Sequence, residues 1–146
     1  MLSFIGKSGN MSFLVAIFLC LPALTLCQVD EVHTLADDVF RRLDLDGDVH
    51  VEKQELVDYF KTYDRNGDGR VSQQEYVTVI DSIYASNPEW QRITHGLFNK
   101  LDYNNDIHLD VLDYDRIFSS ADANANGLVA ENEFNTFFHN LVNGRP

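Results

Sequence analysis

The chain has 146 residues and a formal net charge of −12, with 23 acidic side chains against 11 basic ones. This length suits one compact domain or two small lobes. The acidic balance argues against nucleic acid as a partner, because a polyanion is bound mainly through lysine and arginine.

An apolar run near the N-terminus predicts a secretory signal peptide over residues 1–27. Lys7 precedes the run from 13 to 21, Pro22 breaks it, and residues 25–27 form a small-x-small cleavage site before Gln28. A start at Met11 with a shorter signal is an alternative. An uncleaved membrane anchor is the rival interpretation, because the apolar stretch approaches membrane-spanning length.

Cleavage after Cys27 would leave a secreted chain without cysteine, because Cys20 and Cys27 are both removed. Residues 28–146 hold all the acidic side chains and ten of the basic ones, so their net charge is −13. A bacterial lipoprotein signal at Cys27 is disfavoured, because Leu26 is large for the preceding position. A small secreted domain without disulfides needs another source of stability, and a bound ion is the expected one.

Apolar residues recur at helical spacing along most of the remaining chain. The first stripe starts after Asp30, which suits an N-cap, and later stripes cover residues 76–84, 90–101 and 134–141. Asn87 and Pro88 are expected to end one helix and start the next, since proline suits the first helical position. Residues 143–146 are expected to fray. The first stripe comprises Val32, Leu35, Val39, Phe40 and Leu43.

In residues 44–55, named loop 1, acidic residues alternate with other residues at the start of the segment. This spacing is expected of a chain that curls around a cation. Val49 stands at position 6, where such a turn needs a positive φ, and this strains a β-branched residue by roughly 1–2 kcal/mol. We therefore expect loop 1 either to turn differently or to be strained. Weak metal binding stays open for it, through Asp44, Asp46, Asp48 and Glu55.

Residues 64–75, named loop 2, show the complete pattern, with oxygen side chains at positions 1, 3, 5, 9 and 12, glycine at 6 and valine at 8. This pattern resembles the calcium loop of an EF-hand, in which about six to eight oxygens surround the hard Ca²⁺ ion. The resemblance implies that Gly69 makes the turn and that both oxygens of Glu75 close the site. The implied ligands are Asp64, Asn66, Asp68, Arg70 through its backbone carbonyl, Ser72 and Glu75.

Two more loops follow, residues 102–113 (loop 3) and 122–133 (loop 4). Loop 3 is expected to bind metal poorly, since Ile107 stands at position 6 and the short Asp113 at position 12 hinders bidentate closure. Loop 4 has the right shape but only two carboxylates, which predicts weaker binding than in loop 2. Its implied ligands are Asp122, Asn124, Asn126, Leu128 through its backbone carbonyl, and Glu133.

A shift of 58 residues superposes loop 1 on loop 3 and loop 2 on loop 4, so the chain is an internal duplication. The halves are residues 28–85 and 86–142. The predicted fold is all-α, an EF-hand helix-loop-helix array with two intact loops, two degenerate loops and short β pairings between loops. Aromatic anchors precede each loop, and an apolar residue follows each one: Phe40, Phe60, Phe98 and Phe118, then Leu56, Tyr76, Tyr114 and Phe134.

Only eight residues, 56–63 and 114–121, separate the loops within each half. Eight helical residues span about 12 Å, too little for two helices and a turn. We therefore predict one helix shared by two loops. Loop 2 should then pair with loop 3, placing Val71 beside Leu109, and loop 1 with loop 4, placing Val51 beside Val129.

The function expected from this resemblance is Ca²⁺ binding outside the cell, as a buffer or as a calcium-stabilised matrix component. A sensor that opens an apolar groove to a partner protein is the alternative, but sensors use methionine-rich grooves. The only methionines are Met1 and Met11, both within the predicted signal. The secreted, acidic, cysteine-free layout is similar to that of invertebrate extracellular and shell-matrix EF-hand proteins. Expected partners are calcium ions and an extracellular protein or mineral matrix, with no membrane contact after cleavage.

Neither an enzyme nor a zinc site is expected. No nucleophile elbow is present, and calcium loops account for Gly67 and Gly69 without a phosphate-binding loop. His50 and His108 occupy position 7, where the backbone carbonyl is the ligand, so their rings are expected to face solvent. The other histidines lack zinc-ligand spacing.

Overall fold

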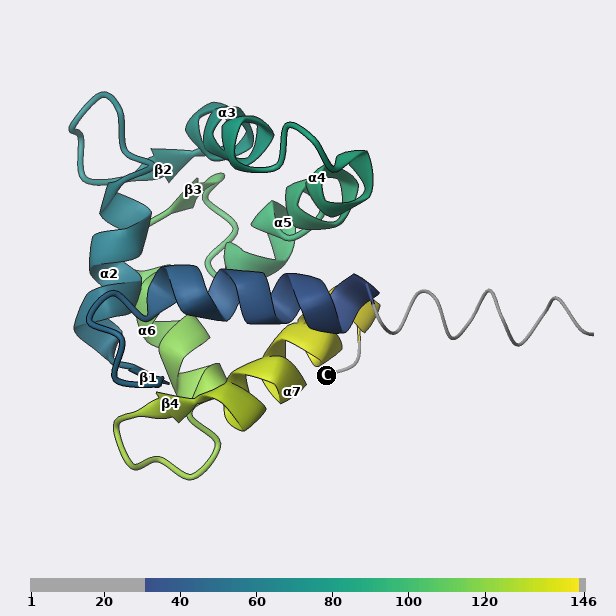
Figure 1. The fold of residues 1–146 in the computed structure, drawn as a ribbon. Coiled ribbons are helices and arrows are strands. Elements are labelled where there is room, and N and C mark those ends of the chain that lie inside the picture. Colours follow the sequence, from purple (N-terminus) through teal and green to yellow (C-terminus); the bar gives the residue numbers. More distant parts are fainter. Residues whose placement is uncertain (1–30, 145–146) are drawn as a thin grey trace, which may run out of the picture. The chain divides into compact units, whose positions relative to one another are not determined.

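The computed structural model describes residues 31–144, so the predicted signal peptide and residues 145–146 lie outside them. Helices and two-residue strands alternate along the chain (Figure 1). The predicted helix-loop-helix array is therefore confirmed. After a helix described over residues 31–43, the elements are β1 (His50–Val51), α2 (Lys53–Lys61), β2 (Val71–Ser72), α3 (Gln73–Ile83), α4 (Pro88–His95), α5 (Phe98–Leu101), β3 (His108–Leu109), α6 (Val111–Ala121), β4 (Val129–Ala130) and α7 (Glu131–Asn143).

A single helix connects the two loops of each half, as the short spacing predicts. α2 follows loop 1 and leads into loop 2, while α6 does the same for loops 3 and 4. At the start of each, the closing carboxylate accepts the N–H of the N-cap residue: Glu55 accepts that of Glu52 at 3.0 Å in α2, and Asp113 accepts that of Asp110 at 3.1 Å in α6. The residue that closes the loop is thus also the third residue of the helix that leaves it.

The strand pairs join the two halves of the duplication. β1 pairs antiparallel with β4, with Val51 opposite Val129, and β2 pairs with β3, with Val71 opposite Leu109. Both predicted pairings and their register are confirmed. Because each pair takes one strand from each half, neither half completes its loop pairing alone.

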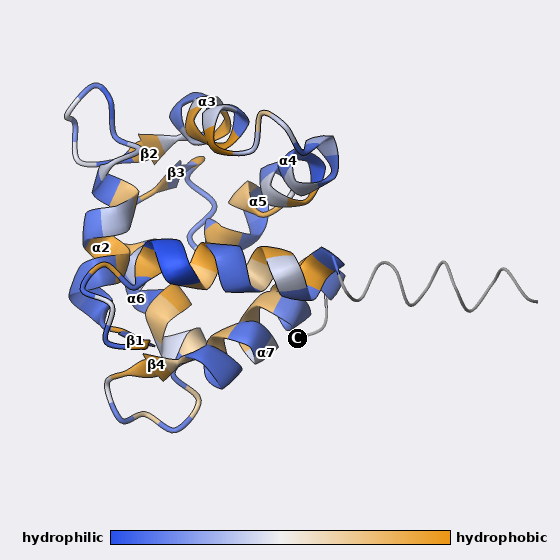
Figure 2. Cartoon of the chain, viewed as in Figure 1, coloured by the Kyte–Doolittle hydropathy of each residue, from blue (hydrophilic) through white to orange (hydrophobic). Residues whose placement is uncertain are grey.

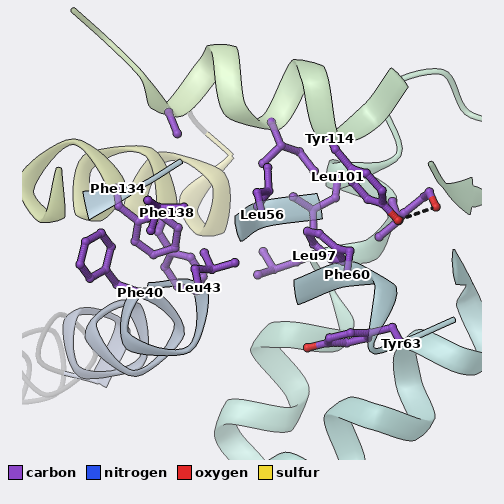
Figure 3. Close-up of a cluster of buried hydrophobic side chains, with 14 of the residues drawn as sticks. Phe40, Leu43, Leu56, Phe60, Tyr63, Leu97, Leu101, Tyr114, Phe134 and Phe138 are labelled. Carbon is purple, nitrogen blue, oxygen red and sulfur yellow. Dashed lines mark hydrogen bonds between the residues drawn. The ribbon is translucent and has the colours of Figure 1, made fainter. Parts of the chain in front are cut away.

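Residues of both halves also share one hydrophobic core (Figure 2). The rings of Phe40 and Phe134 lie 5.6 Å apart, and Phe60 of α2 stacks on Tyr114 of α6 at 5.0 Å with planes 9° apart. Figure 3 shows these aromatic pairs with the leucines that pack between the helices. Aromatic pairs at such distances add to the free energy of burial.

The predicted helix over residues 90–101 differs from the structure. Asn87 caps α4 through its side chain and Pro88 is the first helical residue, as expected, but α4 ends at His95. The N–H groups of Gly96 and Leu97 bond to Ile93 and Thr94 in tight i to i−3 turns. The Thr94 hydroxyl also donates to the Trp90 carbonyl at 2.7 Å. Glycine has low helix propensity, and this turn starts α5 separately.

The C-terminal helix reaches one residue further than predicted. α7 includes Asn143, and Gly144 ends it in the left-handed conformation at φ 66°. Among residues 31–144, no helix combines the length and apolar character needed to cross a membrane.

Candidate metal centre

Glu75 is held in place by backbone groups of loop 2. One carboxylate oxygen accepts the N–H groups of Arg65 and Asn66 at 3.1 and 3.2 Å. The other accepts the Ser72 N–H at 2.9 Å and its hydroxyl at 2.7 Å. The bonds from Ser72, the hydroxyl first, hold the pKa of Glu75 below its ordinary value. Glu75 therefore stands as a carboxylate at neutral pH, at the point where the loop closes.

Asp64 organises the opposite end of loop 2. Its carboxylate accepts the Gly67 N–H at 2.7 Å and the Gly69 N–H at 2.9 Å. Gly69 has φ 85°, a left-handed conformation that glycine adopts without steric penalty. The Asn66 and Asp68 side chains meet through a hydrogen bond of 3.0 Å. Hydrogen bonds thus fix these side chains on loop 2, whereas the clusters of three carboxylates within 4.8 Å lie in loops 1 and 3.

Loop 4 repeats this arrangement with fewer charges. Asp122 accepts the Gly127 N–H at 2.9 Å, and Gly127 has φ 86°. Glu133 accepts the backbone N–H of Asn124 at 3.2 Å and that of Ala130 at 3.1 Å. The Asn124 amide also donates to Glu133 at 2.7 Å. Rotation of that amide by 180° would present its oxygen to a cation instead.

Loop 1 keeps the turn of the intact loops despite Val49. This residue has φ 71°, and its N–H bonds to Asp44 at 3.1 Å as Gly69 bonds to Asp64. The alternative of a different turn is therefore wrong, and the structure has the strained one, at a cost of roughly 1–2 kcal/mol.

The closing residue of loop 1, Glu55, is buried and held as Glu75 is. Burial acts to raise the pKa of Glu55, but hydrogen bonds from the N–H groups of Glu52, Leu45 and Asp46 outweigh it and hold the pKa below its ordinary value. Carboxylate oxygens of the three aspartates lie within 4.8 Å of one another: Asp44, Asp46 and Asp48.

Loop 3 also keeps the turn, with Ile107 at φ 71° bonded to Asp102 at 2.9 Å. Asp113 is fully buried and, despite its shorter side chain, accepts the N–H groups of Tyr103 at 2.8 Å and Asp110 at 3.1 Å. The hydrogen bonds from the loop backbone to Asp113 are thus about as short as those to Glu55 in loop 1. Three carboxylates converge here within 4.8 Å: Asp102, Asp106 and Asp113. The sequence analysis did not name them as ligands, because Ile107 stands at position 6 and the short Asp113 at position 12.

The donor set of all four loops consists of oxygens, which suits a hard cation rather than zinc or copper. The rings of His50 and His108 are half-exposed and lie against their own loops. Their Nδ1 atoms are 3.2 and 3.1 Å from the carbonyl oxygens of Asp48 and Asp106. Glu52 also lies within 4.8 Å of Asp46 and Glu55, a contact that the twelve-residue pattern does not indicate.

Residues 53–139 match the family model described as an EF-hand domain pair. The chain belongs to the EF-hand family. The match covers loops 2, 3 and 4 completely and begins at position 10 of loop 1, so the predicted superfamily is confirmed over most of its span. No curated protein and no solved structure matches the chain. Membership of the family implies calcium binding, and the oxygen-lined loops are the part of the chain that fits it.

Proposed function

We propose that this EF-hand protein is a secreted calcium-binding protein that acts as a buffer or as a calcium-stabilised component of an extracellular matrix. The observation that carries the proposal is loop 2. Backbone N–H groups hold Asp64 at the start of a loop whose position-6 glycine has φ 85°, and Glu75 is held as an anion at the closing position. Ca²⁺ accepts such a flexible set of about six to eight oxygens, whereas Mg²⁺ requires a nearly ideal octahedron.

A stabilising role follows from the crowding of negative charge. Residues 28–146 carry net charge −13 and no cysteine, so neither charge balance nor disulfides help hold the fold. An ion that binds only the folded chain would stabilise it by mass action, and would also offset repulsion among the loop carboxylates. Extracellular modules bind Ca²⁺ at roughly 10⁻⁴–10⁻³ M, where the ion is plentiful.

Calorimetric titration of residues 28–146 with Ca²⁺ tests the site assignment. We expect loop 2 to bind tightest and loop 4 more weakly. Asp64→Ala should remove the tightest binding event, and Asp122→Ala should remove the next. Asp58→Ala is the matched control, because Asp58 lies on α2 outside the loops, is 43% exposed, and pairs with Lys61 at 2.7 Å. Unchanged stoichiometry in Asp64→Ala would refute the assignment of loop 2.

Secretion has its own test. The full chain expressed in a secreting eukaryotic cell should appear in the medium with Gln28 as its first residue, as measured by intact mass. Retention of residues 1–27 on a membrane-bound product would favour the uncleaved anchor. Sedimentation of the secreted chain with calcium carbonate crystals or collagen would then separate a matrix role from a soluble buffer.

A calcium sensor is the second candidate, and one observation favours it. A cavity of about 60 Å³ lies in the shared core between the helices, with an almost wholly apolar lining that includes Leu56, Tyr59, Leu101 and Phe138. Opening of such a core on Ca²⁺ binding would expose a groove. A large calcium-dependent rise in the fluorescence of an apolar dye would support the sensor, while unchanged fluorescence would support the buffer or matrix role.

A further inference from the structure

Loop 3 exposes an apolar surface that the loop paired with it lacks. Its apolar side chains at positions 2, 6, 10 and 11 are 41%, 66%, 57% and 61% exposed, and belong to Tyr103, Ile107, Val111 and Leu112. Among residues 31–144, the other large exposed apolar side chains are Leu45 and Val49 of loop 1. At the same four positions loop 2 has Arg65, Gly69, Gln73 and Gln74.

Neither packing nor backbone preference accounts for Ile107. Its side chain is two-thirds exposed, so it adds little to the core, and its φ of 71° disfavours a β-branched residue. Glycine would make the same N–H bond to Asp102 without strain. A strained residue on the surface indicates a role in binding rather than in folding, since strain of this kind clusters at functional sites.

A groove adjoins this surface and shares Tyr103 with it. The groove has a volume of about 650 Å³ and runs between the end of α6 and α7. The Tyr103 hydroxyl reaches Ser120 at 3.4 Å, and Phe137 with Leu141 supplies apolar lining. Asn132, Thr136 and Asn140 add uncharged polar groups, and Glu133, the closing residue of loop 4, adds a carboxylate. This size can take several side chains of a bound polypeptide.

The charge around loop 3 indicates which kind of partner could bind there. Residues 102–116 contain five aspartates, of which two are buried and Asp115 pairs with Lys53. Asp106 is exposed and Asp110 is half-buried, and Arg116 is the basic residue of this stretch. Lys100 is used inside the molecule, where its ammonium donates to the carbonyls of Leu141 and Val142 that end α7. A second copy of the chain or an anionic lipid surface would bring like charge to this face. A cationic partner would meet complementary charge.

We propose that loop 3 and the groove beside it dock a basic polypeptide segment that carries apolar side chains. Ile107 and Leu112 supply apolar contacts, and Asp106, with the half-buried Asp110, pairs with lysine or arginine of the partner. The groove includes Glu133, the closing residue of loop 4, so the docking adjoins the proposed calcium function and is tested with the calcium sites filled. It also gives the degenerate loop a role other than metal binding.

The test uses residues 28–146 in excess Ca²⁺ at physiological salt, with a fluorescent 18-residue peptide of leucine and lysine as the probe. Ile107→Gly and Leu112→Gln should each weaken peptide binding roughly tenfold or more, as removal of a central contact does. Val49→Gly is the matched control, because it makes the same change at position 6 of loop 1. It should leave the affinity within about twofold. Ile107→Gly relieves strain, so thermal unfolding should show it folded.

Several outcomes would overturn the proposal. A serine–lysine peptide that binds as well as the leucine–lysine peptide would show attraction by charge alone. Equal losses in Val49→Gly and Ile107→Gly, or no binding of the leucine–lysine peptide, would remove loop 3 as the docking surface. Dimers that Ile107→Gly dissociates in sedimentation would assign the surface to a second copy. Binding to phosphatidylserine vesicles that Ile107→Gly abolishes would assign it to a membrane.

Discussion

The two halves of the chain have the same backbone plan and different interiors. Position 6 of all four loops has positive φ, whether the residue is glycine, valine or isoleucine. In each loop the N–H of that residue bonds to the aspartate at position 1. The turn therefore depends on the carboxylates at the two ends of the loop and on strand pairing, and the residue at position 6 decides only its strain.

The halves differ most in their aromatic residues. Tyr59, Tyr63, Tyr76 and Tyr84 of the first half line the shared cavity. A shift of 58 residues places Ile117, Ala121, Phe134 and Val142 at the equivalent positions. The duplicated backbone thus tolerates a hydroxyl-bearing interior in one half and an apolar interior in the other. Substitutions and changes of pH should therefore affect the stability contributed by the two halves unequally.

The largest expected effect is alkaline destabilisation, to which the first half contributes Tyr59, Tyr63, Tyr76 and Tyr84 and the second half Tyr114. Burial raises the pKa of Tyr63, Tyr76 and Tyr84 far above the ordinary value of 10. These tyrosines stay protonated in the folded chain while the unfolded chain ionises, so the unfolding free energy falls as pH rises above 10. Each contributes a slope of about 1.4 kcal/mol per pH unit, with no contribution below pH 10.

Urea unfolding in chelator at pH 9, 10 and 11 checks this slope, with tyrosinate absorbance as the second probe. Tyr76→Phe should reduce the slope by about one tyrosine. It should also lose some stability at neutral pH, because the hydroxyl donates to the Thr94 carbonyl at 3.0 Å. A slope that Tyr76→Phe leaves unchanged would place the alkaline transition elsewhere.

The helices shared by the loops should respond unequally to removal of their phenylalanines. Phe60 is buried and stacked on Tyr114, whereas Phe118 at the equivalent position of α6 is half-buried. Phe60→Ala should lower the unfolding free energy by about 3–5 kcal/mol. Phe118→Ala should cost roughly half as much, since less apolar area is lost. Equal losses in denaturant titration would mean that both rings contribute alike.

At position 6, substitution can give an intact loop the residue of a degenerate loop, and the reverse. A Cβ atom at Gly69 would meet no atom within 4 Å, so Gly69→Val tests strain without a clash. It should cost about 1–2 kcal/mol. Val49→Gly should gain up to about 1 kcal/mol, because the relief of strain exceeds the entropic cost of glycine. Urea unfolding in chelator should show a lower unfolding free energy for Gly69→Val and a higher one for Val49→Gly. A lower unfolding free energy in both variants would contradict this expectation.

The smallest effect concerns an ion pair between the two halves that the duplication does not repeat. Lys53 of α2 pairs with Asp115 of α6 at 2.7 Å, whereas Val111 occupies the equivalent position of the second half. Both side chains are about half-exposed, so Lys53→Met should cost no more than about 1 kcal/mol and less at high salt. Lys61→Met, which breaks a pair within α2, is the control. A loss above 2 kcal/mol would show a stronger link between α2 and α6.

Much of the fold could be predicted because loop spacing is a strong constraint. Eight residues between loops leave room for one helix, and this arithmetic led to the strand partners with their register. The break at Gly96 was missed, because one glycine within an apolar stripe is a weak sign. The carboxylate cluster of loop 3 was left out, because Ile107 at position 6 and the short Asp113 at position 12 were expected to prevent closure.

The sequence by itself determined the four loops, the duplication, the shared helices and the oxygen-only chemistry of the candidate sites. These follow from local spacing and from the few residue types that a tight turn or a hard cation accepts. Only the tertiary structure decided that Val49 and Ile107 adopt the glycine conformation. Hydrogen bonds from both ends of each loop and pairing with a distant strand impose it. Burial, which depends on contacts across both halves, made Phe60 and Phe118 unequal and left the apolar side chains of loop 3 exposed.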